Sequence, residues 1–439
     1  MRTATFKRGV HPSYHKDATA AKPIEDIELP DMIVLPLVQH LGAPAKSLKA
    51  KGDTVAPGEL ICESGGRISA NIHSPVAGTV KRIIQKPLPG GRMADHIEIE
   101  VDKEATRAHS FAEREVDLST LDREKLLRII FDAGIVGMGG ATFPTHVKYA
   151  SPPSNPVDTL VVNGAECEPY LTCDHRLMVE KAPSILSGVN VLQAAFSFKK
   201  IYIGIEENKP DAILAMESAA GELPALPIEV VALEVKYPQG AEKMLIHAAT
   251  GRVVPAGGLP LDIGVIVSNV ATLNAVRDAV YLGKPLIERV LTVSGKGIHE
   301  PKNLRVPIGT PIEHLAASCG GIEATTAKVV LGGPMMGVAI PTLDYAVTKG
   351  TSGLLFLSGR EVPDEGPCIR CGSCIRACPM NLMPLKLAAY AKAGRFEEAK
   401  ALGVADCFEC GACAFGCPAK IRIVGWIRYA KNYIRVKGI

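Results

Sequence analysis

One cysteine run that occurs twice near the C-terminal end constrains this 439-residue chain more than any other feature. The two copies are Cys368-x2-Cys371-x2-Cys374-x3-Cys378-Pro379 and Cys407-x2-Cys410-x2-Cys413-x3-Cys417-Pro418. Each cysteine of the first copy reappears at the same offset in the second. Four cysteines at these spacings, followed by proline, form the ligand pattern of [4Fe–4S] clusters. The sequence therefore predicts two [4Fe–4S] clusters held by a duplicated domain.

The fourth cysteine of each copy is expected to bind the cluster of the other copy. Three thiolates at two-residue gaps surround one cluster, whereas the trailing Cys-Pro begins a helix that points away. Predicted cluster A has the ligands Cys368, Cys371, Cys374 and Cys417, and predicted cluster B has Cys407, Cys410, Cys413 and Cys378. Gly372 and Gly411 let the backbone turn tightly beside the second cysteine of each copy. A pair of zinc sites is the alternative, but zinc sites do not normally use this run with its trailing Cys-Pro.

The remaining cysteines are scattered and are expected to be buried free thiols: Cys62, Cys167, Cys173 and Cys319. Disulfides are not expected, because the start of the chain lacks an apolar signal and the protein should stay in a reducing compartment. No apolar run is long enough to predict a membrane-spanning helix. The net charge is +3 with both signs well mixed, which does not indicate a nucleic-acid partner.

Length and hydrophobic periodicity predict several domains, with the fold class multidomain α/β plus β. The expected parts are an irregular N-terminal extension (1–30), a biotinyl- or lipoyl-like β-sandwich (31–102), an α/β domain (120–285), a β-grasp-like module (286–345), a linker (346–363), a helical ferredoxin-like domain with two clusters (360–420) and a basic tail (421–439). The β-sandwich lacks the cofactor-bearing lysine of lipoyl domains at the expected turn, which favours a structural or docking module. The α/β domain is predicted from strands at 159–163, 200–205, 228–235 and 263–269 that alternate with helices at 184–195, 211–220 and 241–249.

A glycine-rich segment follows the helix predicted at 122–133. It reads Gly137-Met-Gly-Gly-Ala-Thr-Phe-Pro-Thr-His-Val-Lys148. Glycines permit close approach of the backbone to a ligand and Lys148 supplies positive charge, so the segment is a candidate phosphate loop. A structural glycine turn is the alternative, because the segment lacks the G-x-G-x-x-G pattern placed directly after a strand.

Four segments, in the same order, resemble the NADH-oxidising flavin subunit of respiratory complex I. The glycine segment is similar to Gly-Arg-Gly-Gly-Ala-Gly-Phe-Pro, and Asn163-Gly-Ala-Glu-Cys-Glu-Pro169 to Asn-Ala-Asp-Glu-Ser-Glu-Pro. Tyr237-Pro-Gln-Gly-Ala-Glu242 is similar to Tyr-x-x-Gly-Glu-Glu, and Val267-Ser-Asn-Val-Ala-Thr272 to Val-Asn-Asn-Val-Glu-Thr. The resemblance implies a Rossmann-type domain that binds FMN and NADH.

The whole chain resembles the RnfC subunit of the ion-translocating Rnf complex, a ferredoxin:NAD+ oxidoreductase, and Gly9-Val-His-Pro and Leu35–Gly42 resemble the start of that family. The resemblance implies an SLBB-like β-grasp module and non-covalent FMN. The implied contacts of the FMN phosphate and ring edge are Gly137, Gly139, Gly140 and Lys148. The residues implied to hold the isoalloxazine and ribityl chain are Asn163, Glu166, Ser268, Asn269 and Thr272. Phe143 is implied to stack near the nicotinamide or adenine. The implied NADH site has Glu168, Tyr237 and Glu242, and Gly240 is a further cofactor-binding residue.

The resemblance also implies the function. Hydride would pass between NAD(H) and FMN, and single electrons would pass through the two clusters between NAD(H) and ferredoxin, with Na+ or H+ translocation coupled elsewhere in the complex. The implied partners are the other members of the complex, notably a ferredoxin-like iron–sulfur protein, and the implied location is peripheral, on the cytoplasmic face of the inner membrane. No catalytic acid, base or triad is predicted, and His11, His15 and His40 are expected to be solvated or structural.

Two alternatives stay open, one because another enzyme shares this architecture and one because the chain departs from the complex I pattern at three positions. Met138, Ala165 and Ala241 replace an arginine, an aspartate and a glutamate of the compared segments. One alternative is a soluble cobalamin reductase of similar architecture, which also uses flavin and iron–sulfur clusters. The other is a flavin-free electron-relay and docking subunit.

The last twenty residues, from Lys420, contain no acidic side chain and hold the only tryptophan, Trp426. Apolar residues at Ile423, Ile427 and Ile434 alternate with basic ones. Such a segment suits either an anionic membrane surface or membrane subunit, or a helix packed beside the clusters with a solvated basic face.

Overall fold

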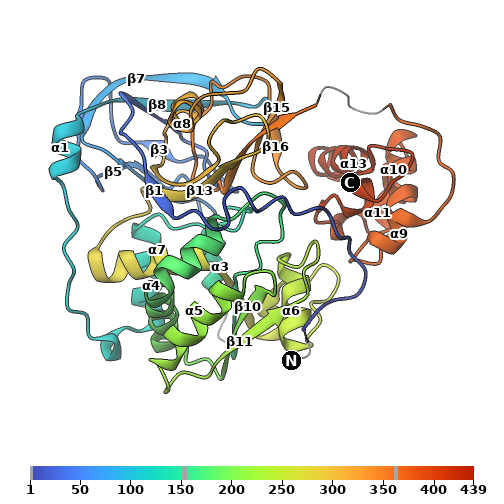
Figure 1. Cartoon of the computed structure of the whole chain (residues 1–439), viewed down its shortest axis with the longest axis horizontal. Helices are drawn as coiled ribbons and strands as arrows, with labels where there is room; N and C mark the ends of the chain where they lie inside the picture. The colour runs from blue at the N-terminus through green and yellow to red at the C-terminus, as the bar shows by residue number, and fades with distance from the viewer. Residues whose placement is uncertain (1–2, 151–155, 360–363) are drawn as a thin grey trace.

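The structure is a computed structural model that describes residues 3–150, 156–359 and 364–439 (Figure 1). Its strands form four sheets within these residues. The C-terminal helices form a lobe at one side of the sheets, on the right in Figure 1. This arrangement agrees with the multidomain α/β plus β class expected from the sequence.

The part that follows the N-terminal extension contains two antiparallel sheets, ordered β2-β8-β7-β4 and β3-β5-β6. Their strands are β2 (Met32–Pro36), β3 (Lys46–Ser47), β4 (Thr54–Val55), β5 (Leu60–Glu63), β6 (Ile72–His73), β7 (Gly78–Pro87) and β8 (Met93–Val101). Alternate side chains of the β2–β8 pair, such as Ile33 and Ile99, are fully buried, as the two-residue period of a strand requires. The helix α1 (Lys103–Ala108) and the short turn η1 (Leu118–Thr120) lead to the next domain.

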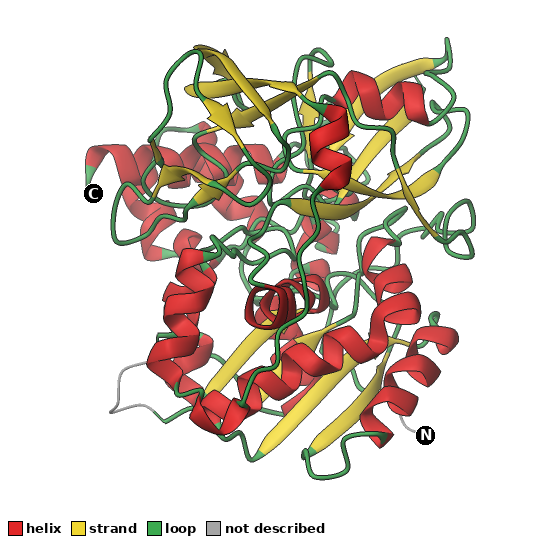
Figure 2. Ribbon diagram, turned by 90° about the vertical axis from the view of Figure 1, so that its left-hand side faces the viewer, coloured by secondary structure: helices red, strands yellow, loops and turns green. Residues whose placement is uncertain are grey.

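A parallel sheet of four strands, ordered β11-β10-β9-β12, forms the centre of the α/β domain. Helices flank this sheet in Figure 2. The strands are β9 (Thr159–Asn163), β10 (Lys200–Glu206), β11 (Ile228–Leu233) and β12 (Val265–Asn269), and the helices are α2 (Arg123–Asp132), α3 (Thr145–Tyr149), α4 (Cys173–Phe196), α5 (Pro210–Gly221), α6 (Glu242–Thr250), α7 (Val270–Leu282) and the turn η2 (Pro260–Ile263). The predicted alternation is confirmed, but α4 begins earlier than the predicted residue 184. Pro183 lies inside α4, beside a kink at Lys181, and a proline in a sequence favours a helix start at that point.

The third part is a six-stranded sheet, ordered β1-β14-β13-β17-β15-β16, with one helix, α8 (Ile312–Ser318). The strands are β1 (Ile24–Asp26), β13 (Glu288–Ser294), β14 (Lys302–Pro307), β15 (Thr326–Leu331), β16 (Val338–Ile340) and β17 (Gly353–Ser358). The expectation of a linker over 346–363 was wrong for 353–358, because β17 pairs with both β13 and β15 in the middle of the sheet, and its last residues, 360–363, lie outside the described residues. The expectation of irregular structure over 1–30 was wrong for β1, which pairs in parallel with β14. Both strands pair over long sequence distances that local pattern does not reveal.

The C-terminal lobe consists of α9 (Ser373–Ala377), α10 (Pro384–Lys392), α11 (Phe396–Ala401), the turn η3 (Val404–Asp406), α12 (Ala412–Phe415) and α13 (Ile423–Lys437). The basic tail forms α13, which packs against α10 and α11 through buried Ile423, Ile427 and Ala430. The structure therefore favours the packed helix over the surface-lying segment. No helix among the described residues is both long and apolar enough to cross a membrane.

Candidate functional site

The order of the parallel sheet reverses between β9 and β12. The chain runs outward from β9 through β10 to β11 and then returns to place β12 on the other side of β9. Open α/β sheets bind ligands at such a point, beyond the carboxyl ends of the strands. Asn163 and Asn269 end these two strands and lie opposite each other in the register. Asn163 Nδ2 donates to the carbonyl of Gly240 at 2.9 Å, so three predicted cofactor residues share this edge.

The glycine-rich loop lies over the same edge of the sheet. Met138 N–H donates to Thr272 Oγ1 at 2.9 Å, in the first turn of α7. A Cβ placed on Gly139 would lie 3.4 Å from the Cβ of Asn269. Gly140 has a φ of 117°, which side chains rarely permit. The N–H groups of Gly139 and Gly140 make no hydrogen bond within the described chain, so both are open to an anionic ligand group.

A buried arginine lies beneath this loop. Met138 is buried where the complex I segment has an arginine, and its carbonyl accepts a hydrogen bond from Arg289 Nη1 at 3.2 Å. Arg289 belongs to β13 and also donates to the carbonyl of Lys349 at 3.0 Å. The six-stranded sheet therefore supports the loop from below with a guanidinium group, which the sequence analysis missed because the two segments are far apart.

The structure brings several further predicted residues to the same place. Lys148 on α3 forms an ion pair with Glu242, the first residue of α6. Tyr149 donates to Ser268 Oγ at 2.7 Å, next to the strand end at Asn269. Phe143 is half-buried, and its carbonyl closes the glycine loop by accepting from Gly137 N–H at 2.8 Å.

The acidic segment after β9 uses its two glutamates in different ways. The Glu166 carboxylate accepts hydrogen bonds from the N–H groups of Asp174 (2.7 Å) and His175 (3.2 Å) at the start of α4. The Glu168 carboxylate accepts from the N–H groups of Met335 (3.0 Å) and Met336 (2.8 Å), between β15 and β16. Glu166 therefore anchors the segment inside the α/β domain, and Glu168 joins it to the six-stranded sheet.

Asp174 is a member of this site that the sequence analysis missed. Its carboxylate accepts from Asn269 Nδ2 at 2.6 Å, and ligand atoms of Asp174, Glu166 and Cys173 lie within 4.8 Å of one another. Burial and the charge of Glu166 raise the pKa of Asp174 to about 7. A carboxyl group that titrates near neutral pH at a ligand-binding edge is characteristic of a functional site. Its position at the start of a helix could have indicated Asp174. The sequence analysis placed that helix start at residue 184, beside Pro183, and therefore passed over it.

The second cysteine run surrounds a cavity in the C-terminal lobe. Its lining includes all four predicted ligands of cluster B and mostly apolar neighbours: Cys378, Cys407, Cys410, Cys413, Met380, Leu382, Leu387, Val424 and Ile427. Burial and the neighbouring Cys410, Cys407 and Cys378 raise the pKa of Cys413. Four convergent thiols in an apolar enclosure suit an iron–sulfur cluster. Among the predicted ligands of cluster A, Cys374 and Cys417 are buried, whereas Cys368 and Cys371 are exposed.

The duplication is also visible in the backbone. Arg370 N–H donates to Cys368 Sγ at 3.3 Å, and at the matching position Glu409 N–H donates to Cys407 Sγ at 3.4 Å. Both donors have a positive φ, as do the matching glycines Gly372 and Gly411. The basic helix α13 holds the second loop, because Arg428 and Lys431 both bind the Glu409 carboxylate. The tail thus has the structural role of one of its two expected forms, a helix packed beside the cysteine runs.

The edge of the parallel sheet that carries the predicted flavin residues (the flavin-type edge) is in direct contact with the C-terminal lobe that holds both cysteine runs (the cluster lobe). Tyr237 is buried, and its hydroxyl donates to the carbonyl of Cys410 at 2.7 Å. Cys167, Tyr237, Ala377 and Ala412 form one buried apolar group at this contact. The two chemical centres predicted from separate motifs therefore share an interface.

Comparison with known families assigns each of these parts. The RnfC barrel sandwich hybrid domain matches residues 4–104, and the Nuo51 FMN-binding domain matches 130–278. The SLBB domain matches 290–339, and the 4Fe-4S dicluster domain matches 367–421. The corresponding member of the proton-translocating ferredoxin:NAD(+) oxidoreductase complex of Clostridium ljungdahlii is 47% identical over 99% of this chain and 95% of its own length. The chain belongs to the RnfC family.

Other RnfC relatives are similar over the full chain. The relative from the Na(+)-translocating ferredoxin:NAD(+) oxidoreductase complex of Acetobacterium woodii is 42% identical over 99% of this chain and 98% of its own length. The relative from the ion-translocating oxidoreductase complex of Rhodobacter capsulatus is also 42% identical, over 98% of this chain and 83% of its own length. An NAD+-reducing [NiFe]-hydrogenase in the H2-reduced state shares the fold, with a TM-score of 0.50 and 18% identity over 74% of this chain and 68% of that one.

This RnfC chain fits both cofactor types that its domains imply. The open N–H groups of Gly139 and Gly140 suit a phosphate, and the cavity lined by four cysteines suits a [4Fe–4S] cluster. The absence of the loop arginine at Met138 leaves these backbone donors in place.

Proposed function

We propose that this chain is the NAD(H)-facing subunit of a membrane-associated Rnf-type complex. It exchanges hydride between NADH and FMN and relays single electrons through two [4Fe–4S] clusters between NAD(H) and ferredoxin, with Na+ or H+ translocation elsewhere in the complex. Its full-length similarity to proteins whose names place them in ferredoxin:NAD(+) oxidoreductase complexes supports this proposal. The observation that carries it is the Tyr237–Cys410 hydrogen bond, which joins the flavin-type edge to the cluster lobe.

The proposed FMN site uses the residues gathered at the switch point of the sheet. Gly137, Gly139, Gly140 and Lys148 would hold the phosphate and ring edge. The isoalloxazine and ribityl chain would contact Asn163, Glu166, Ser268, Asn269 and Thr272. Phe143 would lie near the nicotinamide or adenine, and the NADH site would include Glu168, Tyr237, Gly240 and Glu242. FMN, when bound, supplies the hydride exchange with NADH and divides the electron pair into single electrons. The chain's own residues bind and orient the two groups and exclude water between them.

The proposed cluster ligands are crossed between the two runs. The enclosure of Cys378 with Cys407, Cys410 and Cys413 supports this assignment for cluster B. The burial of both Cys374 and Cys417 in the core of the C-terminal lobe supports it for cluster A, whose other ligands would be Cys368 and Cys371. The repeated backbone conformation is consistent with two equivalent clusters.

The two clusters would have different neighbours. The second run contacts the flavin domain through Cys410, whereas the first run exposes Cys368, Cys371 and Ile369, whose exposed fraction is 65%. Cluster B would therefore exchange electrons with the flavin site, and cluster A with the redox partner. Arginines surround the exposed run, including Arg370 and Arg376, and suit an acidic ferredoxin-like iron–sulfur partner.

A substitution can test this partner surface. Ile369→Asp should slow NADH-driven reduction of the ferredoxin-like partner about tenfold and leave reduction of a small dye unchanged. Leu214→Asp is the matched control, because Leu214 is 66% exposed on α5, away from the clusters. Equal rates for the two variants would place the partner elsewhere.

The finer architecture is part of the same proposal. Residues 1–30 would form an extension that adds β1 to the six-stranded sheet, 31–102 a biotinyl-like β-sandwich, 120–285 a Rossmann-type FMN/NADH domain, 286–345 together with β17 an SLBB-like β-grasp module, 360–420 a double-cluster ferredoxin-like domain and 421–439 a basic tail. The protein would lie peripherally on the cytoplasmic face of the inner membrane, held by other members of the complex.

Anaerobic titration of the cofactor-loaded protein with NADH tests the proposed function. Bleaching of both the flavin and the cluster absorption is expected, with a total uptake that exceeds the two electrons of the flavin alone. Intact cofactors that NADH does not bleach would exclude the mechanism. A native protein with clusters but without a flavin spectrum would instead favour the electron-relay alternative, and co-purification with an adenosyltransferase rather than membrane proteins of the complex would favour the cobalamin reductase.

A further inference from the structure

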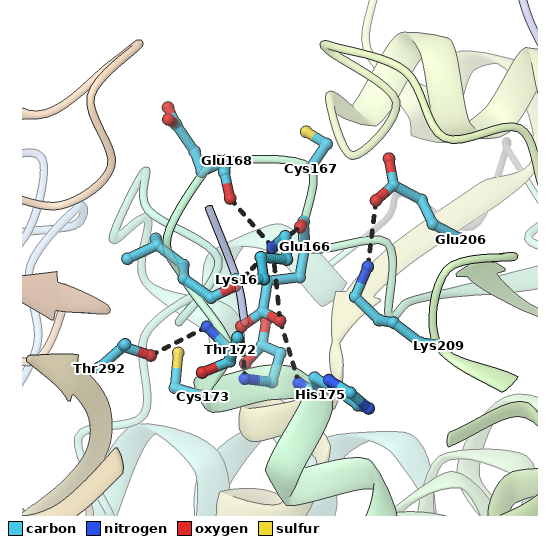
Figure 3. A network of polar contacts seen from close by, with 12 residues as sticks. Lys16, Glu166, Cys167, Glu168, Thr172, Cys173, His175, Glu206, Lys209 and Thr292 are labelled. Atoms are coloured by element: carbon cyan, nitrogen blue, oxygen red, sulfur yellow. Dashed lines mark hydrogen bonds and ion pairs between the residues drawn. The ribbon is translucent and has the colours of Figure 1, made fainter. Parts of the chain in front are cut away.

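The N-terminal extension places a buried lysine inside the loop that connects β9 to α4. Lys16 Nζ donates to three backbone carbonyls, those of Glu166 (2.8 Å), Glu168 (3.0 Å) and Leu171 (2.5 Å). Figure 3 shows Lys16 at the centre of this network, with the loop turned around it. The side chain is only 9% exposed, although it lies about 150 residues from its partners in sequence. The loop thus folds around a side chain that another part of the chain supplies.

The three carbonyl acceptors suit a charged lysine, and they offset the burial that lowers the pKa of Lys16. A protonated ammonium group has three N–H donors, and the three carbonyls use all of them. A neutral amine would leave one buried carbonyl without a donor. The Glu166 carboxylate is the ion-pair partner, but it lies 3.9 Å away and already accepts two N–H groups from the start of α4. The positive charge of Lys16 is therefore directed mainly at the backbone of the loop.

The backbone conformation of the loop over residues 166–171 needs contacts from outside the loop to hold it. Glu166 and Tyr170 have φ values of 47° and 68°, in a region that residues other than glycine adopt at a cost. Residues on either side of Lys16 add contacts: Tyr170 N–H donates to the Tyr14 carbonyl at 2.7 Å, and the rings of His15 and Tyr170 stack. The loop is thus held in an unfavourable backbone conformation by the N-terminal extension.

A second buried lysine provides a useful contrast. Lys209 donates to the carbonyl of Ala165 at 2.7 Å, but it also pairs with the buried Glu206 at 3.0 Å. The charge of Lys209 is therefore neutralised locally, and its contact with the loop is a single bond. Lys16 makes three bonds that span both proposed cofactor glutamates.

We propose that Lys16 is a positioning residue for the NADH and flavin site, which holds the Glu166–Leu171 loop so that the carboxylates of Glu166 and Glu168 are correctly placed. This inference rests on the proposed function. It assigns a role in the reaction to the N-terminal extension, which lies outside the flavin-type domain in sequence. Lys16 acts through the loop and does not itself need to contact NADH or FMN.

The experiment compares Lys16→Met with Lys22→Met in the full, cofactor-loaded chain. Lys22 lies in the same extension and is exposed, and among the described residues its side chain donates only to the Pro301 carbonyl, so it is a matched control. Lys16→Met should raise the KM for NADH roughly tenfold or more, with a smaller effect on kcat, and should shift the flavin midpoint potential. Hydrogen exchange should increase in residues 164–171 and not in the cysteine runs, and the cluster EPR signals should not change. Lys22→Met should match the original protein in all of these measurements.

Two outcomes would overturn the inference. One is Lys16→Met with the original KM and flavin potential. The other is a uniform loss of flavin, clusters and exchange protection, which indicates a purely structural role. If Lys16→Met does not fold, Lys16→Gln replaces it, since the amide retains two donors, and original kinetic values would again overturn the inference. Failure of the proposed function is distinguishable, because the unsubstituted chain would then show no NADH bleaching.

Discussion

The hydroxyl of Tyr237 and the carbonyl of Cys410 are joined by a 2.7 Å hydrogen bond. Tyr237 belongs to the segment proposed to line the NADH site, and Cys410 is a proposed ligand of cluster B. Burial and the charge of Glu168 raise the pKa of Tyr237, so the phenol remains protonated and can donate over the physiological pH range. The contact provides a continuous bonded path between the flavin-type domain and a cluster.

Removal of this hydrogen bond should slow electron transfer. Tyr237→Phe keeps the ring packing but leaves the Cys410 carbonyl without its donor, at a cost of about 1 kcal/mol. We expect the cluster reduction that follows flavin reduction to slow several-fold in stopped-flow measurements with NADH. Flavin and iron contents should not change, because Tyr237 belongs to the proposed NADH site and is neither a proposed FMN contact nor a proposed cluster ligand.

Tyr345→Phe is the control for this substitution. Tyr345 is half-buried beside the core of the six-stranded sheet, and its hydroxyl makes no hydrogen bond within the described residues. Tyr345→Phe should leave the rate of cluster reduction unchanged. Cluster reduction at the original rate in Tyr237→Phe would show that electrons take another route.

Crossed ligation predicts which cysteine substitutions have the same effect. Cys378→Ser should damage the cluster of the second run, because Cys378 lies in the cavity with Cys407, Cys410 and Cys413. Its EPR spectrum should therefore match that of Cys407→Ser and differ from that of Cys368→Ser. Cys319→Ala is the control, since Cys319 is buried in the core of the six-stranded sheet and should leave both clusters intact. A match between Cys378→Ser and Cys368→Ser would instead show that each run binds its own cluster.

The glycine loop offers a test that separates flavin from clusters. Gly140 has a φ of 117° and open space around it, so Gly140→Ala strains the backbone at the proposed phosphate site. We expect FMN occupancy to fall several-fold while iron content is unchanged. Gly90→Ala is matched, because Gly90 has a φ of 95° and is also open, but lies in the turn between β7 and β8. Equal flavin loss in both variants would mean that the strain acts on general stability.

The sequence predicted what depends on local pattern. The strand–helix alternation of the α/β domain and the cysteine spacing are local features, and the structure has the corresponding elements close to their expected bounds, except for the earlier start of α4. The predicted residues Asn163, Gly240 and Asn269 meet because parallel strands end at one edge of a sheet.

The features of the fold and of the site that the sequence did not predict depend on contacts between distant segments. Lys16 enters a loop near residue 170, and Arg289 reaches the carbonyl of Met138 from another sheet. β17 pairs with β13, which begins at Glu288, so a segment that resembled a linker is a central strand. No periodicity or spacing in a single sequence encodes these pairings. The composition of α13 suited either a membrane surface or a helix packed beside the clusters, and the contacts of Arg428 and Lys431 with Glu409 favour the packed helix.

Asp174 makes the stability of the protein depend on pH in a defined direction. Its pKa rises from its ordinary value of 3.8 to about 7 in the folded state, because of burial and the charge of Glu166. Between these two values the folded chain binds more protons than the unfolded chain, so this contribution to stability falls as pH rises and is constant above about 7. Asp174→Asn removes the titration and keeps an oxygen that can accept from Asn269 Nδ2. The variant should melt at a higher temperature than the original protein near pH 8 and at a similar temperature near pH 4, in scans of the same cofactor-loaded preparation. A difference in melting temperature that does not grow between these pH values would show that Asp174 is ionised throughout, with its charge satisfied by Asn269 and the start of α4.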